Sequence, residues 1–285
     1  MGELARVRIA MDEKELLATI KNLGWKGAWE AQLKGLSSKL SFLISKGRYQ
    51  KLLRNIKTAN DKNNFVASIL EATIAFQFES AGIELDYEIR QDPNSTGSID
   101  FSWKTAAGST VFIEVRLLQQ GKAPTGSTDG DDEKQDIVRV QGVILEKVQK
   151  KDGTPRKFLA MHKGRINIVA VDISQIVMGM FDSQDCKLVT FGDPSVRTIN
   201  RRGVFGLFQE AMPEYPEHIR LRAQSYDHIR KTLHGVLFLF RKPKTELFNY
   251  PIQRFLAWNP GLMDKEKAAA ICNEIKPALP LMRWT

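Results

Sequence analysis

Cysteine is scarce in this chain: Cys186 and Cys272 are the only two in 285 residues. A disulfide framework or a thiolate zinc site is therefore not expected. Long apolar runs are also missing, because the longest, such as 166–173 and 236–240, fall far short of the ~18 residues of a membrane span. The first 20 residues contain several acids instead of the apolar run of a signal peptide. We expect an intracellular, cytoplasmic protein with no membrane partner.

Three common catalytic and nucleotide-binding motifs are absent as well. Residues 121–128 imitate a phosphate-binding loop, but Ser127 stands where that loop needs lysine. The histidines lack His-Glu-x-x-His spacing, and no Gly-x-Ser-x-Gly elbow occurs. These absences argue against ATP binding at that loop, a zinc site and the simplest serine hydrolases.

The charge is unevenly distributed along the sequence. The formal net charge is +9, yet residues 1–60 hold 12 basic and 5 acidic side chains, whereas residues 61–130 hold 5 and 10. An acidic centre with basic flanks is expected if carboxylates gather around a divalent cation and the flanks hold phosphates, although chance fluctuation explains it equally well. The candidate nucleic-acid-binding residues in the flanks are Arg48, Lys51, Arg54, Arg197, Arg201 and Arg202.

Hydrophobic periodicity predicts an α/β fold. The pattern indicates helices over 12–24, 37–57, 62–80, 132–151 and 225–233, and strands over 83–90, 99–103, 110–118, 166–173, 235–240 and 255–258. The three strands between 83 and 118 are separated by short turns, which predicts an antiparallel meander. Strand 166–173 is apolar on both faces, as expected in a sheet covered by helices.

Three acidic residues occupy positions where an acid is costly. Glu71 lies in the middle of a predicted helix on an apolar face, so it is either a buried carboxylate or a functional one. Asp100 begins a short strand between hydrophobic neighbours. Glu114 and Arg116 interrupt an otherwise apolar strand and share one face, because strand side chains alternate.

Asp100 and Glu114 lie on consecutive predicted strands, so their carboxylates can converge. Converging carboxylates repel each other unless a cation neutralises them. Mg²⁺ or Mn²⁺ would do this with oxygens from Asp100, Glu114 and the carbonyl of Val115. The alternative is a salt bridge between Glu114 and Arg116, with Asp100 capping a turn.

These acids resemble a known motif. Ile99-Asp100, a 13-residue gap and Glu114-Val115-Arg116, preceded by a helix with Glu71, are similar to the PD-(D/E)XK nuclease superfamily of restriction-endonuclease-like folds. The resemblance covers residues 62–175. It implies a mixed central sheet flanked by helices, metal ligation by Asp100 and Glu114, and completion of the site by Glu71.

The sequence departs from that motif at two positions. Ile99 replaces the usual proline, without mechanistic consequence. Arg116 replaces the usual lysine, and an arginine, which stays protonated, is better suited to clamping a phosphate than to orienting water. Gln141 and Lys147 in the next helix lie where related nucleases often place polar groups that face the site. Lys147 could therefore supply the missing ammonium group.

The expected organisation has three parts: a basic helical N-terminal region (1–61), a nuclease-like core (62–175) and a C-terminal α/β extension packed on that core (176–285). The expected function is Mg²⁺-dependent (or Mn²⁺-dependent) phosphodiester hydrolysis on DNA, with Asp100, Glu114, Arg116 and Lys147 as catalytic residues. One alternative is an inactive subunit of the same fold that binds nucleic acid or a partner protein, and a homodimer is a further option. Another is a plain interaction protein whose carboxylates only form salt bridges.

Overall fold

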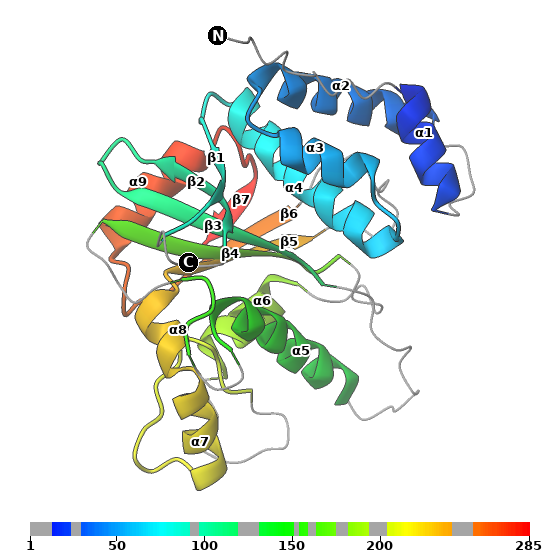
Figure 1. The fold of residues 1–285 in the computed structure, drawn as a ribbon. Helices are drawn as coiled ribbons and strands as arrows, with labels where there is room; N and C mark the ends of the chain where they lie inside the picture. Colours follow the sequence, from blue (N-terminus) through cyan, green and yellow to red (C-terminus); the bar gives the residue numbers. More distant parts are fainter. Residues whose placement is uncertain are drawn as a thin grey trace.

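The structure of the chain is a computed structural model, and it describes residues 13–23, 30–91, 97–118, 131–150, 154–158, 164–174, 182–193, 204–240 and 253–285. Within these ranges the chain forms an α/β fold in which helices flank a seven-stranded mixed sheet (Figure 1). The predicted α/β class is confirmed.

The strands lie in the sheet in the same order as in the sequence. They are β1 (Asp86–Ile89), β2 (Ile99–Lys104), β3 (Thr110–Leu117), β4 (Arg165–Asp172), β5 (Gly235–Phe240), β6 (Gln253–Trp258) and β7 (Met282–Trp284). Strands β1 to β3 form the predicted antiparallel meander. Strand β4 pairs parallel to both β3 and β5, β6 is antiparallel to β5, and β7 is parallel to β6.

Helices cover the sheet on both faces. On one face α1 (Glu13–Asn22), α2 (Glu30–Lys46), α3 (Gln50–Lys57), α4 (Lys62–Ser80) and α9 (Lys265–Ile275) share one hydrophobic core. On the other face α5 (Asp131–Val148), α6 (Ser183–Phe191), α7 (Glu217–Ser225) and α8 (Asp227–Thr232) share a second core. Figure 1 shows these layers above and below the sheet. Strand β4, between them, is buried along nearly its whole length, as its sequence predicts.

Helix α4 follows directly from its sequence and carries one of the three acids. The Asp61 carboxylate caps its N-terminus by accepting the Asn64 N–H at 2.9 Å. Gly82 follows its C-terminus with φ +83°, a left-handed conformation that glycine adopts without strain. The predicted bounds, 62–80, are confirmed.

Two predicted elements differ from the structure between residues 37 and 90. The single helix expected over 37–57 is wrong: α2 and α3 are separate, because Gly47 ends α2 with φ +76°. The strand expected over 83–90 is shorter, since the Leu85 N–H donates to the Glu79 carboxylate of α4 at 3.0 Å instead of to a neighbouring strand. The first difference comes from the backbone conformation of one glycine, and the second from a side chain that replaces a strand partner.

The C-terminal part contains elements that periodicity did not predict. Helices α6, α7 and α9 and strand β7 were missed, and the helix expected over 225–233 is instead α8, which directly follows α7. Only Ala223 of α7 is buried, so this helix has no apolar stripe to detect. Strands β5, β6 and β7 continue the same sheet as β1 to β4.

Candidate functional site

The fold brings together the three acids that the sequence identifies. Glu71 comes from the middle of α4, Asp100 from the start of β2 and Glu114 from the middle of β3. Strands β2 and β3 are in register at Phe101 and Ile113, which sets Asp100 next to Glu114. The Asp100 carboxylate accepts the Val115 N–H through Oδ2 at 2.7 Å, so it does not cap a turn.

Glu114 is fully buried and is held by two lysines. Its Oε1 accepts the ammonium groups of Lys147, at the end of α5, and of Lys157, in the segment that follows α5. Its Oε2 is buried without a hydrogen-bond partner in the described part of the chain. The ion pair that the alternative assigned to Arg116 is thus formed by lysines. Arg116 is half-buried, and its Nε also lacks a partner among the described residues.

Electrostatic contact between the acids changes their titration. Burial first, then the charges of Asp100 and Glu114, raise the pKa of Glu71 to about 8, although the Tyr87 hydroxyl and Lys147 oppose this rise. Burial and Glu114 raise the pKa of Asp100 to about 7, against Lys157, Lys147 and the Val115 N–H. Both carboxylates therefore favour a bound proton or a neutralising cation.

Tyr87 orients Glu71 from the neighbouring strand. Its hydroxyl donates to Oε2 of Glu71 at 3.1 Å. Burial and the charge of Glu71 raise the pKa of this hydroxyl, so the phenol keeps its proton and acts as a donor. The Glu71 side chain is thereby anchored at one oxygen, which leaves Oε1 for another partner.

A polar groove gives access to Glu71 from the helical side. It has a volume of about 370 Å³ and is formed by α3, α4 and the turn between them. Its polar lining residues are Asn55, Thr58, Asn60, Asn64, Ser68 and Glu71. The groove therefore connects one of the three acids with solvent.

The donor chemistry of the site suits a hard divalent cation. Carboxylates and a backbone carbonyl are the oxygen ligands that Mg²⁺ and Mn²⁺ prefer, and Oε2 of Glu114 is a buried oxygen without a hydrogen-bond partner among the described residues. In the described ranges, however, no three His, Cys, Asp or Glu side chains lie close enough to hold a metal ion as they stand. The chemistry of the donors fits such an ion, and closure of the site would require side-chain movement.

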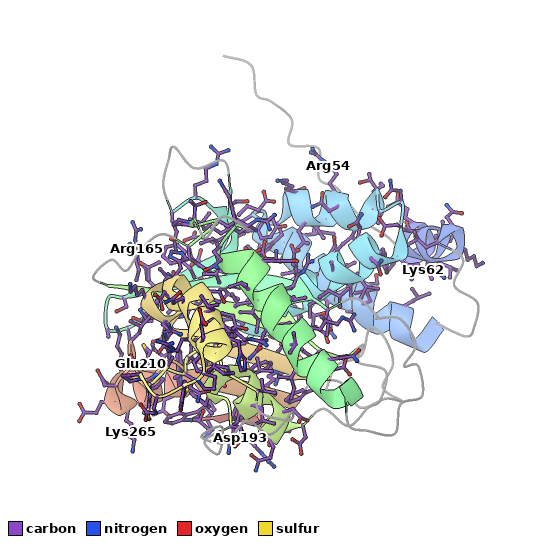
Figure 2. The ribbon with its side chains drawn as sticks, turned by 90° about the horizontal axis from the view of Figure 1, so that it is seen from below. Arg54, Lys62, Arg165, Asp193, Glu210 and Lys265 are labelled. Atoms are coloured by element: carbon purple, nitrogen blue, oxygen red, sulfur yellow. The ribbon has the colours of Figure 1, made fainter. Side chains whose placement is uncertain are left out.

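Three predicted nucleic-acid-binding residues lie in α3 or in the turn before it, and they differ in whether they form ion pairs within the protein. Arg48 binds Glu79 and Glu84, and Lys51 pairs with Glu88 at 2.7 Å. Arg54 is exposed and points outward from α3 (Figure 2). Arg197, Arg201 and Arg202 lie outside the described residues. Lys51 and Arg54 are thus both exposed, whereas Arg48 is half-buried.

Gln141 does not face the three acids, contrary to the sequence-based expectation. Its amide donates to the carbonyls of Val189 at 3.0 Å and Phe205 at 2.8 Å. Its oxygen accepts from Arg222 and Tyr226. Gln141 therefore joins α5 to its neighbours on the far side of that helix and has a structural role.

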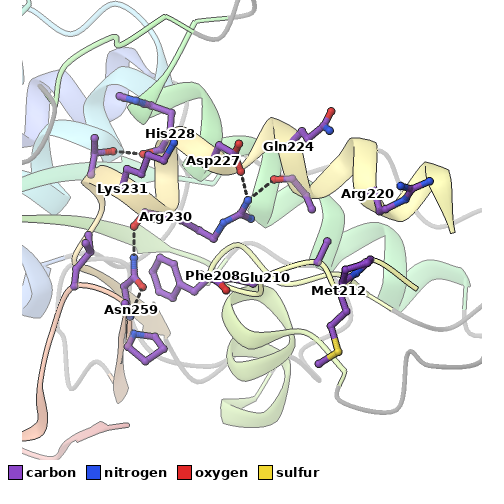
Figure 3. Close-up of a pocket in the computed structure, with 17 residues that line it drawn as sticks. Phe208, Glu210, Met212, Arg220, Gln224, Asp227, His228, Arg230, Lys231 and Asn259 are labelled. Atoms are coloured by element: carbon purple, nitrogen blue, oxygen red, sulfur yellow. Dashed lines mark hydrogen bonds and ion pairs between the residues drawn. The ribbon is translucent and has the colours of Figure 1, made fainter. Parts of the chain in front are cut away.

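A larger pocket, of about 1040 Å³, lies beside α7 and α8 (Figure 3). Several of its polar groups are already engaged with one another. Arg230 donates to Asp227 and to the carbonyls of Gln209 and Ala223, and Asn259 donates to the carbonyl of Arg230 at 2.9 Å. These bonds account for the Arg230 and Asn259 side chains within the protein, and we assign no chemistry to this pocket.

Lys157 is the residue that sequence reasoning missed. It lies outside every predicted element and 43 positions after Glu114. A weak signal existed, because basic residues outnumber acidic ones around it in 154–165. Only the reversal of the chain after α5 brings Lys157 to Glu114.

Comparisons with known proteins add no relative. No family model matches the chain, and searches of curated proteins and of solved structures find no significant match. The structure also contains no helix, within the described ranges, that is long and apolar enough to cross a membrane. The residues of the site are therefore the only indication of its function within the described ranges.

Proposed function

We propose that this chain is a Mg²⁺- or Mn²⁺-dependent nuclease of the PD-(D/E)XK type that hydrolyses phosphodiester bonds in DNA. The observation that carries the proposal is the electrostatic contact of three acids, Glu71, Asp100 and Glu114, in a buried site that also contains lysine. Structural carboxylates rarely gather in this way, because their charges repel each other.

The order of elements supports the same proposal. Helix α4, the meander β1 to β3, crossover helix α5 and the parallel strand β4 follow each other as the resemblance implies for a core over residues 62–175. In this arrangement α4 and α5 approach the meander from opposite faces (Figure 1). The charges of Asp100, Glu114 and Lys147 nevertheless all act on Glu71, so the acids of α4, β2 and β3 and the lysine of α5 can act at one site.

Each residue has a distinct role in the proposed reaction. Asp100, Glu114 and the carbonyl of Val115 would hold the cation, with Glu71 completing the site. A bound divalent ion would polarise the phosphoryl oxygen and lower the pKa of the attacking water. The ammonium group of Lys147 and the guanidinium group of Arg116 stabilise the negative charge that develops on the phosphate. No covalent intermediate with the protein is needed.

The test is a cleavage assay on the full chain. Plasmid DNA, single-stranded DNA and RNA are each incubated with Mg²⁺, Mn²⁺ or EDTA, and Asp100→Ala and Glu114→Ala serve as controls. We expect cleavage of DNA that requires a divalent ion and that both substitutions abolish. Equal cleavage by the wild-type and doubly substituted proteins would contradict the assignment.

The second candidate is an inactive subunit of the same fold that binds nucleic acid. Arg116 in place of the usual lysine is the observation that favours it. Binding of DNA by the wild-type chain, without cleavage under any of these conditions, would favour this candidate over the nuclease.

A further inference from the structure

The buried Glu114 carboxylate contacts two ammonium groups, whose combined positive charge exceeds its own negative charge. Lys147 and Lys157 both contact its Oε1, although one carboxylate carries a single negative charge. The side chains of the two lysines are only 17% and 21% exposed, so neither charge is fully solvated. Ammonium groups held this close repel each other. A second lysine at this oxygen therefore calls for a reason other than neutralisation of Glu114.

Lys157 is placed at Glu114 by the backbone around it. After α5 the chain reverses: the Lys150 N–H donates to the Thr154 carbonyl at 2.8 Å, and the Arg156 N–H donates to the Val148 carbonyl at 2.9 Å. On the other side, Phe158 is fully buried in the core below the sheet. The backbone is thus held in place on both sides of Lys157, and this positions the Lys157 ammonium group at Glu114.

Lys157 lies beside a pair of acids. The register of β2 and β3 sets Asp100 opposite Glu114, and the Lys157 ammonium group contacts Oε1 of Glu114. Lys157 therefore lies against the pair formed by Asp100 and Glu114, which are the two carboxylates assigned to the cation.

We propose that Lys157 is an exchangeable counterion of Glu114. While no divalent cation is bound, its ammonium group neutralises the acids. Once a divalent cation is bound, the ammonium group turns to the substrate phosphate. This inference rests on the proposed function and adds a substrate-contacting residue to it. A divalent cation bound at the other oxygen, Oε2, would repel the Lys157 ammonium group at Oε1 and so favour its release from Glu114. The released ammonium remains in the site, where it compensates for the lysine that Arg116 replaces.

The exchange predicts that Lys157 and a divalent cation compete. When two groups are linked in this way, the binding of one commonly changes the affinity for the other by roughly 5- to 150-fold. Lys157→Met in the full chain should therefore bind Mn²⁺ at least about fivefold more tightly than the wild type in calorimetric titration. It should melt at a lower temperature in EDTA, where Glu114 has lost a partner, and this deficit should shrink in saturating Mn²⁺.

Two further variants serve as controls. Lys157→Arg keeps the positive charge and should restore the wild-type Mn²⁺ affinity. Lys150→Met removes an exposed lysine from the same chain reversal and should behave as the wild type in both measurements. If Lys157→Met does not fold, Lys157→Gln removes the charge but keeps a hydrogen-bond donor, and the same tighter binding is expected.

The outcomes separate this inference from the proposed function. Unchanged or weaker Mn²⁺ binding by the Lys157 variants, or an equal loss of melting temperature with and without Mn²⁺, would overturn the counterion role even if the wild type cleaves DNA. A wild-type chain that neither binds Mn²⁺ nor cleaves any substrate would overturn both proposals.

Discussion

The backbone N–H of Val115 donates to the Asp100 carboxylate across strands β2 and β3 at 2.7 Å. This bond lies just beyond Phe101 and Ile113, which are the last paired residues of the two strands at this end. A side chain thus takes the place of the next backbone partner. Asp100 is thereby held beside Glu114 by the sheet itself, so the closeness of the two acids does not depend on any bound ion.

Stability should fall with rising pH because of Glu71 and Asp100. An acid whose pKa is higher in the folded chain than in the unfolded chain binds more protons when folded. Its contribution to the free energy of unfolding is fully present below the unfolded value, near pH 4, and is lost as the pH rises through the folded values of about 7 and 8. We expect the melting temperature in EDTA to decrease between about pH 6.5 and 8.5.

The matched variants are Asp100→Asn and Glu71→Gln, which imitate the protonated acids. Each should flatten the decrease, and the double variant should flatten it most. The range begins at the ordinary histidine pKa of about 6.5. His234, whose pKa burial lowers to about 4, therefore adds a slope of opposite sign only at the lower end of the range. A pH profile of the double variant parallel to that of the wild type would contradict the assignment.

Asp100 and Glu114 should differ in their effect on stability. Asp100→Asn removes a repelling charge and should raise the melting temperature in EDTA at pH 8. Glu114→Gln leaves Lys147 and Lys157 without their counterion and should lower it, with a loss of about 1–3 kcal/mol in the free energy of unfolding. Chemical denaturation of both variants measures this contrast. Similar shifts for the two would show that the lysines do not stabilise Glu114.

The sequence predicts the acids of this site better than their cations. Alternation along β2 and β3 and the capping of α4 are local signals, so Glu71, Asp100 and Glu114 could be identified from short segments. The ion partners of Glu114 depend on how α5 crosses the sheet, and no pattern within a short segment predicts that crossing. Arg116 is therefore wrong as the predicted ion partner of Glu114, and Gln141 is wrong as a residue that faces the site. Lys157 is not predicted at all.

The same limit applies to the rest of the fold. Strand β5 and helix α4 have strong patterns, and their bounds are predicted without error. The break between α2 and α3 follows from Gly47 and from the pairing of Arg48 with Glu79 of α4, which are separated by 31 positions. Strand β7 has only three residues and little burial, so it carries no alternation to detect.

Basic residues of α3 should contribute to nucleic-acid binding according to their exposure. Arg54→Glu should weaken DNA binding and reduce its dependence on salt, because an exposed arginine releases counterions from phosphate. The fold should remain stable. Binding measured by fluorescence anisotropy over a series of salt concentrations tests this, and an unchanged salt dependence would exclude Arg54 from the interface.

Arg48→Ala should act mainly on the fold instead. Arg48 bonds to the buried Glu79 carboxylate, which also accepts from Tyr49 at 2.6 Å. Loss of this charged partner should cost about 1–3 kcal/mol of the free energy of unfolding. Denaturation of Arg48→Ala beside Arg54→Ala measures the difference. Comparable stability of the two variants would mean that the Arg48 network contributes little.

Arg116 distinguishes the active enzyme from the inactive subunit. It shares a strand face with Glu114, is half-buried and has a buried Nε without a partner among the described residues. If its guanidinium group clamps the phosphate, Arg116→Ala should lower the single-turnover rate in Mn²⁺ roughly 10²-fold or more, the scale for removal of one preorganised donor. Arg116→Lys should keep part of the activity or exceed the wild type, because it introduces the lysine that is usual in the motif which this sequence resembles. Glu114 is neutralised by Lys147 and Lys157, so neither substitution should change the melting temperature much. A stability loss in Arg116→Ala, together with no cleavage by any variant, would instead support the inactive, binding-only protein.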